Sequence, residues 1–231
     1  MLIKRVPQEV NDEINELRPY LAKLHLELIR WGLVVWTAGN ISQRLTTDPS
    51  IFIIKPSGVS YDELDARSMV VCDLEANKLN TDNKYVPSSD TAAHAYVYKN
   101  MDHIGGVVHT HSTYATSWAA SREPISCELT MMADEFGGEI PVGPFALIGD
   151  DSIGRGIVET LKKSRSRAVL MANHGPFTVG KDAKDALKAA VMCEEVAKTI
   201  HTAHIRSANR FPIPQDKVDR LWERYQNVYG Q

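Results

Sequence analysis

The sequence predicts an α/β protein that forms a single domain over residues 1–231, and three observations support this class. Apolar residues make up 43% of the 231 residues, which is enough for the core of one large domain. Segments with helical periodicity alternate along the chain with short runs rich in β-branched residues. Polar turns follow these runs repeatedly. The alternation indicates helices packed on a sheet, and it leaves the strand order open.

The first predicted helix covers residues 10–31, where Ile14, Leu21 and Leu28 recur at helical spacing. Pro19 lies inside this pattern. Because proline removes a backbone N–H donor and crowds the preceding turn, either the helix kinks at this position or a second helix starts there.

Two short strands are predicted next, at residues 51–54 and 69–73, because both runs are apolar and the first is rich in isoleucine. Residues 92–98 have helical propensity and follow several residues that commonly cap helices. Capping by Ser89 or Asp90 is therefore the plain interpretation of that segment. The alternative is a helix N-terminus that binds an anion.

The remaining part of the chain continues the alternation of helices and strands. The expected elements are a strand at 107–111, a helix at 114–121, an extended piece at 140–142, a helix at 151–163, strands at 168–172 and 177–179, and helices at 182–204 and 215–225. His201 and His204 fall near the end of the long helix, where we expect them to interact with the helix dipole and solvent rather than with a metal.

Three histidines at predicted strand ends form a candidate metal centre. His109 and His111 are spaced i, i+2, so a strand would place both imidazoles on one face. His174 ends another predicted strand, and three histidines with an open fourth position match the ligand count of a catalytic zinc site. Asp90 could be a fourth ligand or a carboxylate that orients an imidazole ring. The alternative is a set of unrelated polar residues, since sequence separation proves no proximity.

Three polar turns are candidate anion sites, because backbone N–H groups and small polar side chains at such turns can bind phosphate. These turns contain Gly39 and Asn40, Ser57 and Gly58, and Ser88 and Ser89. An ordinary loop is the alternative for the first turn, and simple helix capping is the alternative for the third. The formal net charge is -3, so nothing global attracts nucleic acid or an anionic membrane, and an anionic substrate needs such a local site.

The cysteine content indicates a reducing compartment. Cys72, Cys127 and Cys193 are few, odd in number and far apart, which argues against a disulfide framework and against a cysteine-based zinc site. The N-terminus shows no apolar signal core, and no run is long enough to span a bilayer. A cytoplasmic location without a membrane partner is therefore expected.

Five short motifs occur in an order that resembles the class II aldolase/adducin family, over about residues 10 to 231. The motifs are Thr-Ala-Gly-Asn, Ile-Lys-Pro-Ser-Gly, Pro-Ser-Ser-Asp-Thr, Val-His-Thr-His-Ser and Asn-His-Gly-Pro-Phe. The resemblance implies a central, mostly antiparallel sheet flanked by helices. It also implies a homotetramer with active sites at the subunit interfaces. The three polar turns would hold the phosphate of a phosphorylated sugar.

The resemblance further assigns the candidate metal ligands and the activity. It implies that His109, His111 and His174 bind a divalent cation, with Asp90 on or near the metal; zinc is the expected ion and manganese is possible. Within the family the motifs are most similar to those of L-ribulose-5-phosphate 4-epimerases, which break and reform the C3–C4 bond of the sugar with a metal ion as Lewis acid. Asp134 and Tyr229 match the epimerase acid/base pair, and the tyrosine would come from a neighbouring subunit.

Two other functions of the family are kept as alternatives. An L-fuculose-phosphate-type aldolase would use the same metal and phosphate sites, but it usually carries Glu where this chain has Asp90. Thr37-Ala38-Gly39-Asn40 is nevertheless aldolase-like. A non-enzymatic adducin-like scaffold would have lost metal ligands, whereas this chain has all three histidines. The motifs do not decide between an arabinose and an ascorbate pathway.

Overall fold

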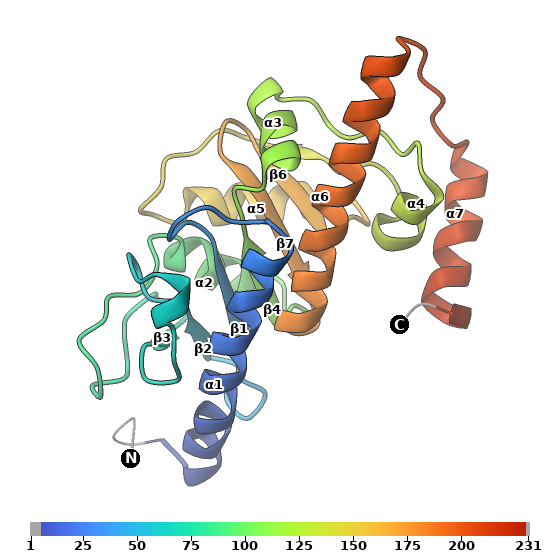
Figure 1. Cartoon of the computed structure of the whole chain (residues 1–231). Coiled ribbons are helices and arrows are strands. Elements are labelled where there is room, and N and C mark those ends of the chain that lie inside the picture. Colours follow the sequence, from blue (N-terminus) through green and yellow to red (C-terminus); the bar gives the residue numbers. More distant parts are fainter. Residues whose placement is uncertain (1–5, 230–231) are drawn as a thin grey trace.

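A seven-stranded sheet lies at the centre of the computed structural model, which describes residues 6–229 apart from the side chain of Tyr229. The strands are β1 (Asn40–Arg44), β2 (Ile51–Ile54), β3 (Val70–Asp73), β4 (Gly106–His109), β5 (Val142–Gly143), β6 (Ala168–Met171) and β7 (Gly175–Gly180). Their order is β3-β2-β1-β4-β7-β6-β5, and only the β5–β6 pair is parallel. The predicted α/β class with a mostly antiparallel sheet is confirmed (Figure 1).

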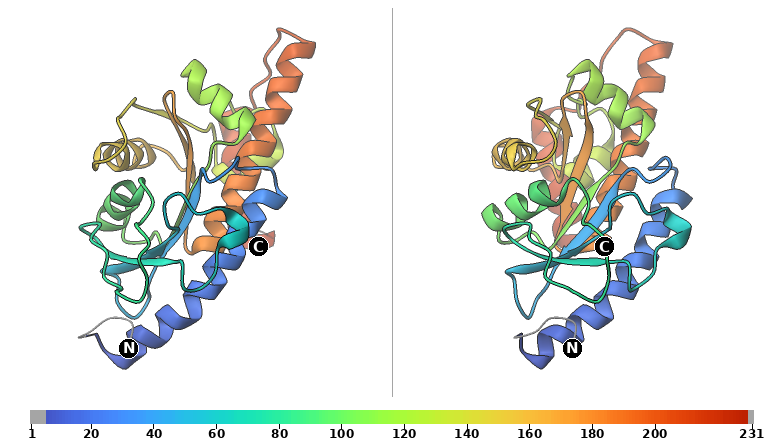
Figure 2. Two further views of the ribbon diagram at one scale, coloured as in Figure 1. Left: turned by 60° about the vertical axis from the view of Figure 1, so that its left-hand side comes forward. Right: turned by 90° about the vertical axis from the view of Figure 1, so that its left-hand side faces the viewer.

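Helices cover both faces of this sheet. They are α1 (Gln8–Arg30), α2 (Thr91–Asn100), α3 (Thr113–Ser121), α4 (Thr130–Phe136), α5 (Ser152–Leu161), α6 (Ala183–Arg206) and α7 (Gln215–Arg224), followed by a π-helical stretch, η2 (Tyr225–Tyr229). Figure 2 shows α2 and α5 on one face of the sheet and α1 and α6 on the other. Helices α3, α4 and α7 pack around the far half of α6.

Strand β2 illustrates why the sequence forms these layers. All four of its residues are buried. Ile51 and Ile53 belong to the core beneath α1 and α6, whereas Phe52 and Ile54 belong to the core beneath α2 and α5. Side chains alternate between the two faces of a strand, so a continuous apolar run fits a strand that is covered on both sides.

The structure excludes one of the two interpretations of Pro19 and contains two elements that were not predicted. Helix α1 runs through Pro19 without a second start, because Pro19 is exposed and the carbonyl of Asn15, which loses its donor, is on an exposed turn that water can reach. Strand β1 was not predicted, since its sequence Asn-Ile-Ser-Gln-Arg is too polar to indicate a strand. Helix α4 was not predicted either, because its seven residues are too few for a periodic pattern.

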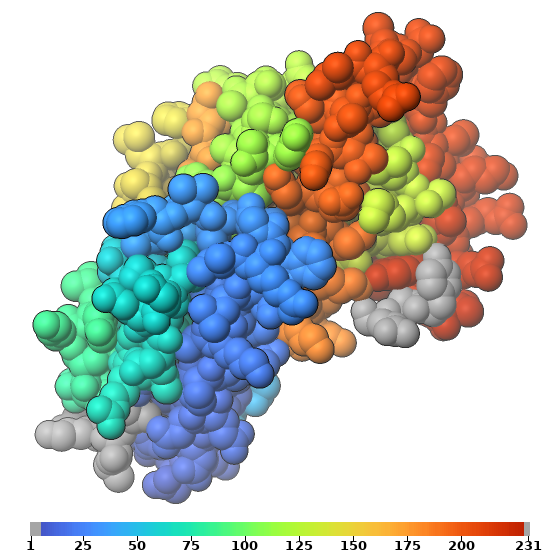
Figure 3. Space-filling model, in the orientation of Figure 1, coloured from blue at the N-terminus to red at the C-terminus, as the bar shows by residue number. Residues whose placement is uncertain are grey.

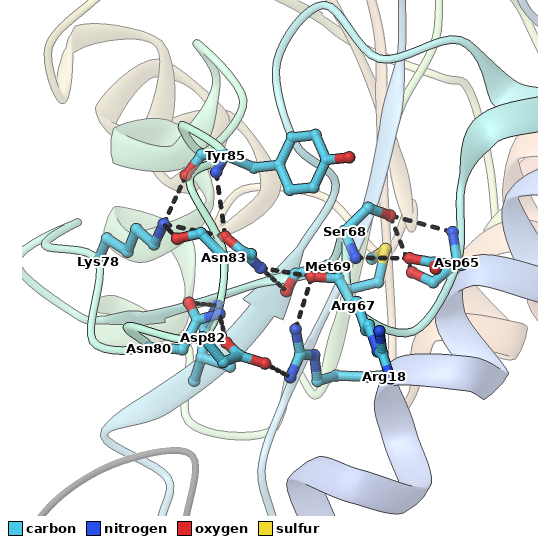
Figure 4. A network of polar contacts seen from close by, with 11 residues as sticks. Arg18, Asp65, Arg67, Ser68, Met69, Lys78, Asn80, Asp82, Asn83 and Tyr85 are labelled. Carbon is cyan, nitrogen blue, oxygen red and sulfur yellow. Dashed lines mark hydrogen bonds and ion pairs between the residues drawn. The ribbon is translucent and has the colours of Figure 1, made fainter.

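A polar network fixes the long connection between β3 and α2 against α1 (Figure 4). Arg18 is 4% exposed, and its guanidinium donates to Asp82 at 2.7 Å and to the carbonyl of Arg67 at 2.8 Å. Asn80 donates to the other oxygen of Asp82 at 2.7 Å. Lys78 donates to the carbonyls of Asn83 and Tyr85, which closes the connection on itself. These contacts position the segment that leads to the start of α2.

We expect Arg18→Met to lower the free energy of unfolding by about 1–3 kcal/mol, because the variant loses two hydrogen bonds to a buried charged group. Urea denaturation measures this change. The matched control is Arg30→Met, which removes an exposed pair with Glu27 and should change the stability by less than about 0.5 kcal/mol. If both variants lose the same free energy of unfolding, the buried network does not stabilise the fold more than an exposed ion pair does.

No helix within residues 6–229 is both long enough and apolar enough to cross a membrane. The three cysteines are buried and free, as the sequence indicates for a protein without a disulfide framework.

Candidate active site

Three histidines from two segments that are distant in sequence meet at one end of the sheet. His109 is the last residue of β4, His111 follows two residues later, and His174 lies in the short connection between β6 and β7. One ring nitrogen from each lies within 4.8 Å of the other two. The Nε2 atoms of His109 and His111 are 3.1 Å apart, close to the roughly 3.3 Å expected for two nitrogens on one tetrahedral zinc ion. The expected convergence of His174 with the pair is confirmed.

The surroundings of the three rings favour neutral imidazoles with free lone pairs. Nδ1 of His109 donates to the carbonyl oxygen of Pro176 at 3.0 Å, which leaves Nε2 available as a ligand. Burial, followed by the neighbouring His174 and His111, holds the pKa of His109 well below its ordinary value. Burial also lowers the pKa of His111 and of His174, and the Asp90 carboxylate partly opposes this effect. Because a metal binds deprotonated imidazole, these shifts favour a metal over protons at neutral pH.

Asp90 faces this cluster and does not cap α2. It occupies the N-cap position, but its side chain accepts no capping hydrogen bond, so the prediction of capping by Ser89 or Asp90 is wrong. One carboxylate oxygen of Asp90 accepts from Nδ2 of Asn40 at 2.8 Å. The other oxygen is buried and has no hydrogen-bond partner among the described residues. A buried carboxylate oxygen without a donor is costly unless a cation satisfies it, so Asp90 fits a role at or beside the metal.

The three polar turns predicted to bind an anion are joined to one another next to Asp90. The turn at 56–58 is bonded to the segment before α2, since Ser57 N donates to Val86 O at 2.9 Å. Asn40 donates to Oγ of Ser88 at 3.0 Å, which connects the Gly39–Asn40 turn to the same segment. Ser57, Gly58 and Ser89 are exposed and can reach a ligand. The turns therefore assemble as expected, and their binding of phosphate remains a prediction.

Two glycines, Gly39 and Gly175, allow the backbone segments of the site to approach each other closely. Gly39 has a φ of 83°, and a Cβ atom there would lie 2.7 Å from Val34 Cγ1 and 3.0 Å from the carbonyl oxygen of His109. A Cβ atom on Gly175 would lie 2.7 Å from the carbonyl oxygen of Thr110. Side chains at either position would push apart the segments that carry the predicted phosphate and metal groups.

Lys55 belongs to this site and was missed by the sequence analysis. It continues the apolar β2 strand, is 1% exposed, and donates from Nζ to the carbonyls of Thr37 and Pro56, both at 3.2 Å. Its ammonium also lies 5.1 Å from the centre of the Tyr61 ring. No carboxylate of the described residues forms an ion pair with it, and burial lowers its pKa to about 8. Lys55 thus places a buried positive charge between two of the predicted phosphate turns.

His25 is a second residue whose role was missed: its ring connects α1 to the strand that begins at Asn40. Nε2 of His25 accepts the backbone N–H of Ile41 at 2.9 Å, and Nδ1 donates to the carbonyl oxygen of Leu21 at 2.7 Å. The buried ring therefore ties α1 to the first residues of β1. Burial lowers the pKa of His25 to about 3, so the ring is neutral and can accept this bond. A histidine on the apolar face of a predicted helix was the available signal.

Two histidines near the end of α6 are outside the cluster. His204 pairs with Glu128 at 3.0 Å, and its ring packs edge-on against Trp118. The ring of His201 lies against that of Tyr114. The expectation that neither residue contributes to the three-histidine cluster agrees with the structure, although His204 contacts a carboxylate rather than solvent alone.

The two predicted acid/base residues are on elements that carry none of the three histidines. Asp134 is on α4, which packs against α6 and α7, and Figure 1 shows these helices on the outer side of α6. Tyr229 ends the π-helical stretch that follows α7, and its side chain lies outside the described part of the chain. Their roles in catalysis remain predictions.

The protein therefore has an α/β fold, and its three clustered histidines are the kind of ligands found in catalytic metal centres. Three neutral imidazoles and a nearby carboxylate are ligands that suit zinc and other divalent transition metals. The linked polar turns beside the cluster are the predicted place for an anionic group.

The chain belongs to the class II aldolase/adducin family. The family model described as "Class II Aldolase and Adducin N-terminal domain" matches residues 20–201. A protein of Mycoplasma pneumoniae named "Probable L-ribulose-5-phosphate 4-epimerase UlaF" is 40% identical over 94% of this chain and 96% of its own length. Enzymes of this family depend on a divalent metal, in agreement with the triad.

Solved structures have the same fold. An L-fuculose 1-phosphate aldolase superposes with a TM-score of 0.84 at 26% identity, over 91% of this chain and 96% of that one. YgbL from Klebsiella pneumoniae superposes with a TM-score of 0.76 at 27% identity, over 90% of this chain and 98% of that one. The fold implied by the motif resemblance is therefore confirmed.

Proposed function

We propose that this protein is a metal-dependent L-ribulose-5-phosphate 4-epimerase, which interconverts L-ribulose 5-phosphate and D-xylulose 5-phosphate. The observation that carries the proposal is the convergence of His109, His111 and His174 beside the linked Asp90–Asn40–Ser88 contacts. The 40% identical relative with this activity in its name supports the choice of substrate. We further propose a cytoplasmic role in pentose phosphate metabolism, with arabinose catabolism as the pathway to test first.

The proposed metal ligands are the three histidines, with Asp90 as a fourth ligand or as an orienting carboxylate. We propose zinc, with manganese as the alternative, because three imidazoles and one carboxylate suit either ion. When bound, such an ion supplies Lewis-acid stabilisation of the negative charge that develops on substrate oxygens as the C3–C4 bond breaks.

The residues of the chain have three tasks in this reaction. The polar turns and Lys55 bind the phosphate, so that the two-carbon aldehyde fragment stays in the site after the C3–C4 bond breaks. A base removes the proton of the C4 hydroxyl during cleavage, and after the aldehyde has rotated, an acid returns a proton to the same oxygen as the bond reforms on the other face. Asp134 and Tyr229 are the proposed pair, acting from opposite faces.

We expect Lys55→Met to raise KM about 10-fold to 100-fold with a smaller effect on kcat, because a charge-assisted bond to the substrate phosphate contributes about 1.5–3 kcal/mol. The dependence of kcat/KM on pH in the wild type should also report the ionisation of Lys55. Burial depresses the pKa of Lys55 to about 8, so the ammonium is present below this pH and is lost above it. The value of kcat/KM should therefore fall as the pH rises through about 8.

Lys55→Arg is the matched control for this pH dependence. The guanidinium stays protonated over the whole range, so the decrease of kcat/KM near pH 8 should disappear even if the absolute rate is lower. A wild-type profile that remains flat up to about pH 9.5 would contradict the assignment of Lys55 to the phosphate site.

We propose that the protein is a homotetramer whose active sites lie at subunit interfaces. Trp31, Val35 and Trp36 are 56%, 72% and 87% exposed. Large contiguous apolar patches at a protein surface often mark an interaction site. Trp36 also has a φ of 57°, which is unusual for an aromatic residue and often marks a functional constraint. These residues adjoin the Gly39–Asn40 turn, so the apolar surface borders the proposed active site.

A groove of about 500 Å³ between α1 and α6 extends this apolar surface, and Figure 3 shows the two helices side by side. Its lining is Tyr20, Lys23, Leu24, Glu27, Trp31, Lys184, Leu187, Lys188, Val191 and Met192. The proposed occupant is a second copy of the chain. Asp134 is on α4, which packs against α6 and α7 and carries none of the three histidines, so we propose that a neighbouring chain completes the site with its acid/base groups.

Trp36→Arg is expected to lower the molar mass in solution from that of a tetramer to that of smaller species, because a buried charge without a partner opposes association. Light scattering after size-exclusion chromatography measures this change. Turnover should fall together with the tetramer fraction. A Trp36→Arg protein that remains fully tetrameric would place the interface elsewhere.

Two substrates test the proposed function against the aldolase alternative. The purified protein is incubated with L-ribulose 5-phosphate and, separately, with L-fuculose 1-phosphate. The proposal predicts D-xylulose 5-phosphate from the first and little free lactaldehyde from the second. Lactaldehyde formation without epimerisation would favour the aldolase, which the superposition with an L-fuculose 1-phosphate aldolase keeps as the second candidate. Absence of both products and of bound metal would favour a non-enzymatic scaffold.

A further inference from the structure

Glu135 is a buried carboxylate next to a proposed acid/base residue, and it has no part in the site described above. It follows Asp134 on α4 and is 1% exposed. One of its oxygens pairs with the guanidinium of Arg167. The other accepts a hydrogen bond from the hydroxyl of Tyr225 at 3.0 Å and lies 3.1 Å from Nζ of Lys188. Both oxygens of this buried group are therefore engaged by charged or polar partners.

These contacts connect four separate parts of the chain. Glu135 is on α4, Lys188 is on α6, Tyr225 opens the π-helical stretch, and Arg167 directly precedes β6. Lys188 also contacts the Tyr225 hydroxyl at 2.5 Å. Burial by itself lowers the pKa of Lys188, but its contacts with Tyr225 and Glu135 more than offset this effect and hold the pKa above its ordinary value. Lys188 is therefore protonated at neutral pH, and its charge compensates that of Glu135.

Two of the elements that this network joins, α4 and the π-helical stretch, carry the proposed proton-transfer groups. Asp134 is adjacent to Glu135 on a helix of seven residues, and Tyr229 is at the end of the π-helical stretch that Tyr225 opens. A seven-residue helix and a C-terminal turn have little stability of their own and depend on tertiary contacts for their position. Helix α4 packs along α7 and touches the π-helical stretch, so the network lies where the two elements meet.

We propose that Glu135 is a positioning residue: through its hydrogen bond with Tyr225 it fixes α4 relative to the C-terminal π-helix, and so holds Asp134 and Tyr229 at the spacing that proton transfer requires. This inference rests on the proposed function, because it assigns a purpose to two groups of the epimerase reaction. Glu135 itself touches neither the metal ligands nor the phosphate turns in the contacts described above. Its loss should therefore affect the chemical step rather than substrate binding.

The test uses Tyr225→Phe, which removes only the hydroxyl, together with Glu135→Gln, which keeps the shape of the side chain. Both should lower kcat for L-ribulose 5-phosphate, Tyr225→Phe by about 10-fold, while KM and the metal content stay within about twofold of the wild type. The proposed metal ligands and phosphate-binding residues are on other elements of the fold. Loss of a positioning residue should therefore change kcat and leave KM and metal content unchanged. Glu135→Gln leaves two cations without their partner, so its melting temperature is measured as well.

Asp219→Asn is the matched control. It removes an exposed pair with Arg165 that links α7 to the segment before β6, and this pair does not involve Glu135. Its kcat, KM and metal content should equal those of the wild type. A normal kcat in Tyr225→Phe, or a fall in kcat accompanied by an equal rise in KM or by loss of metal, would overturn the inference. Failure of the wild type to convert L-ribulose 5-phosphate would instead overturn the proposed function.

Discussion

Removal of divalent metal with a chelator is expected to abolish epimerisation, and His109→Ala is expected to lower kcat/KM by at least about 10³-fold. Stabilisation of a developing oxyanion by a metal ion contributes several kcal/mol, and each 1.36 kcal/mol changes a rate tenfold. His109 is 1% exposed and its ring is held by the Pro176 carbonyl, so the alanine variant loses a ligand that the structure positions. Initial rates with L-ribulose 5-phosphate measure the effect.

Two controls distinguish a metal effect from general damage. Zinc or manganese added back to chelated wild-type protein should restore turnover, whereas the same addition to His109→Ala should not. His103→Ala alters an exposed histidine outside the cluster and should leave the rate unchanged. Full activity in metal-free wild-type protein would refute the Lewis-acid role.

Replacement of Tyr229 by Phe is expected to lower kcat by about 10² to 10⁴-fold with little change in KM, the range associated with loss of a general acid or base. Asp134→Asn should have an effect of the same order. Tyr85→Phe is the control, because the hydrogen bonds that Tyr85 forms in the structure come from its backbone. A wild-type rate for Tyr229→Phe would remove this residue from the mechanism.

Mixed subunits test whether the acid/base pair acts from a neighbouring chain. His109→Ala and Tyr229→Phe proteins are each nearly inactive, but subunits exchanged at equal ratio should regain activity in about one quarter of the sites, since half of the metal sites are intact and half of these face an intact tyrosine. No recovery in mixed tetramers would place both groups in one subunit.

The three-histidine cluster could be predicted only in part from the local spacing of residues in the sequence. His109 and His111 could be paired from their spacing, because residues two apart on a strand share a face. His174 was added to them as an assumption from ligand count, which the motif resemblance then supported, since no local rule brings β4 and the β6–β7 connection together. The antiparallel pairing of β4 with β7, in which His109 lies opposite Phe177, brings these two segments together.

Most of the remaining differences arise from tertiary contacts. Asp90 was expected to cap α2, but the Asn40 amide competes for its side chain from a strand fifty residues earlier. Lys55 was missed although a signal existed, because a lysine that continues a buried apolar strand needs a partner for its charge. The short α4 helix and the network around Glu135 depend on tertiary packing, which no window of sequence reveals.

Metal analysis of the purified protein tests the central claim most directly, since the proposed site requires three imidazoles around one cation. Elemental analysis of the wild type and of the single alanine variants of His109, His111 and His174 measures the metal bound per chain. The account predicts about one divalent ion per chain in the wild type and a large loss in each variant. A His174→Ala protein that keeps its full metal content would contradict it.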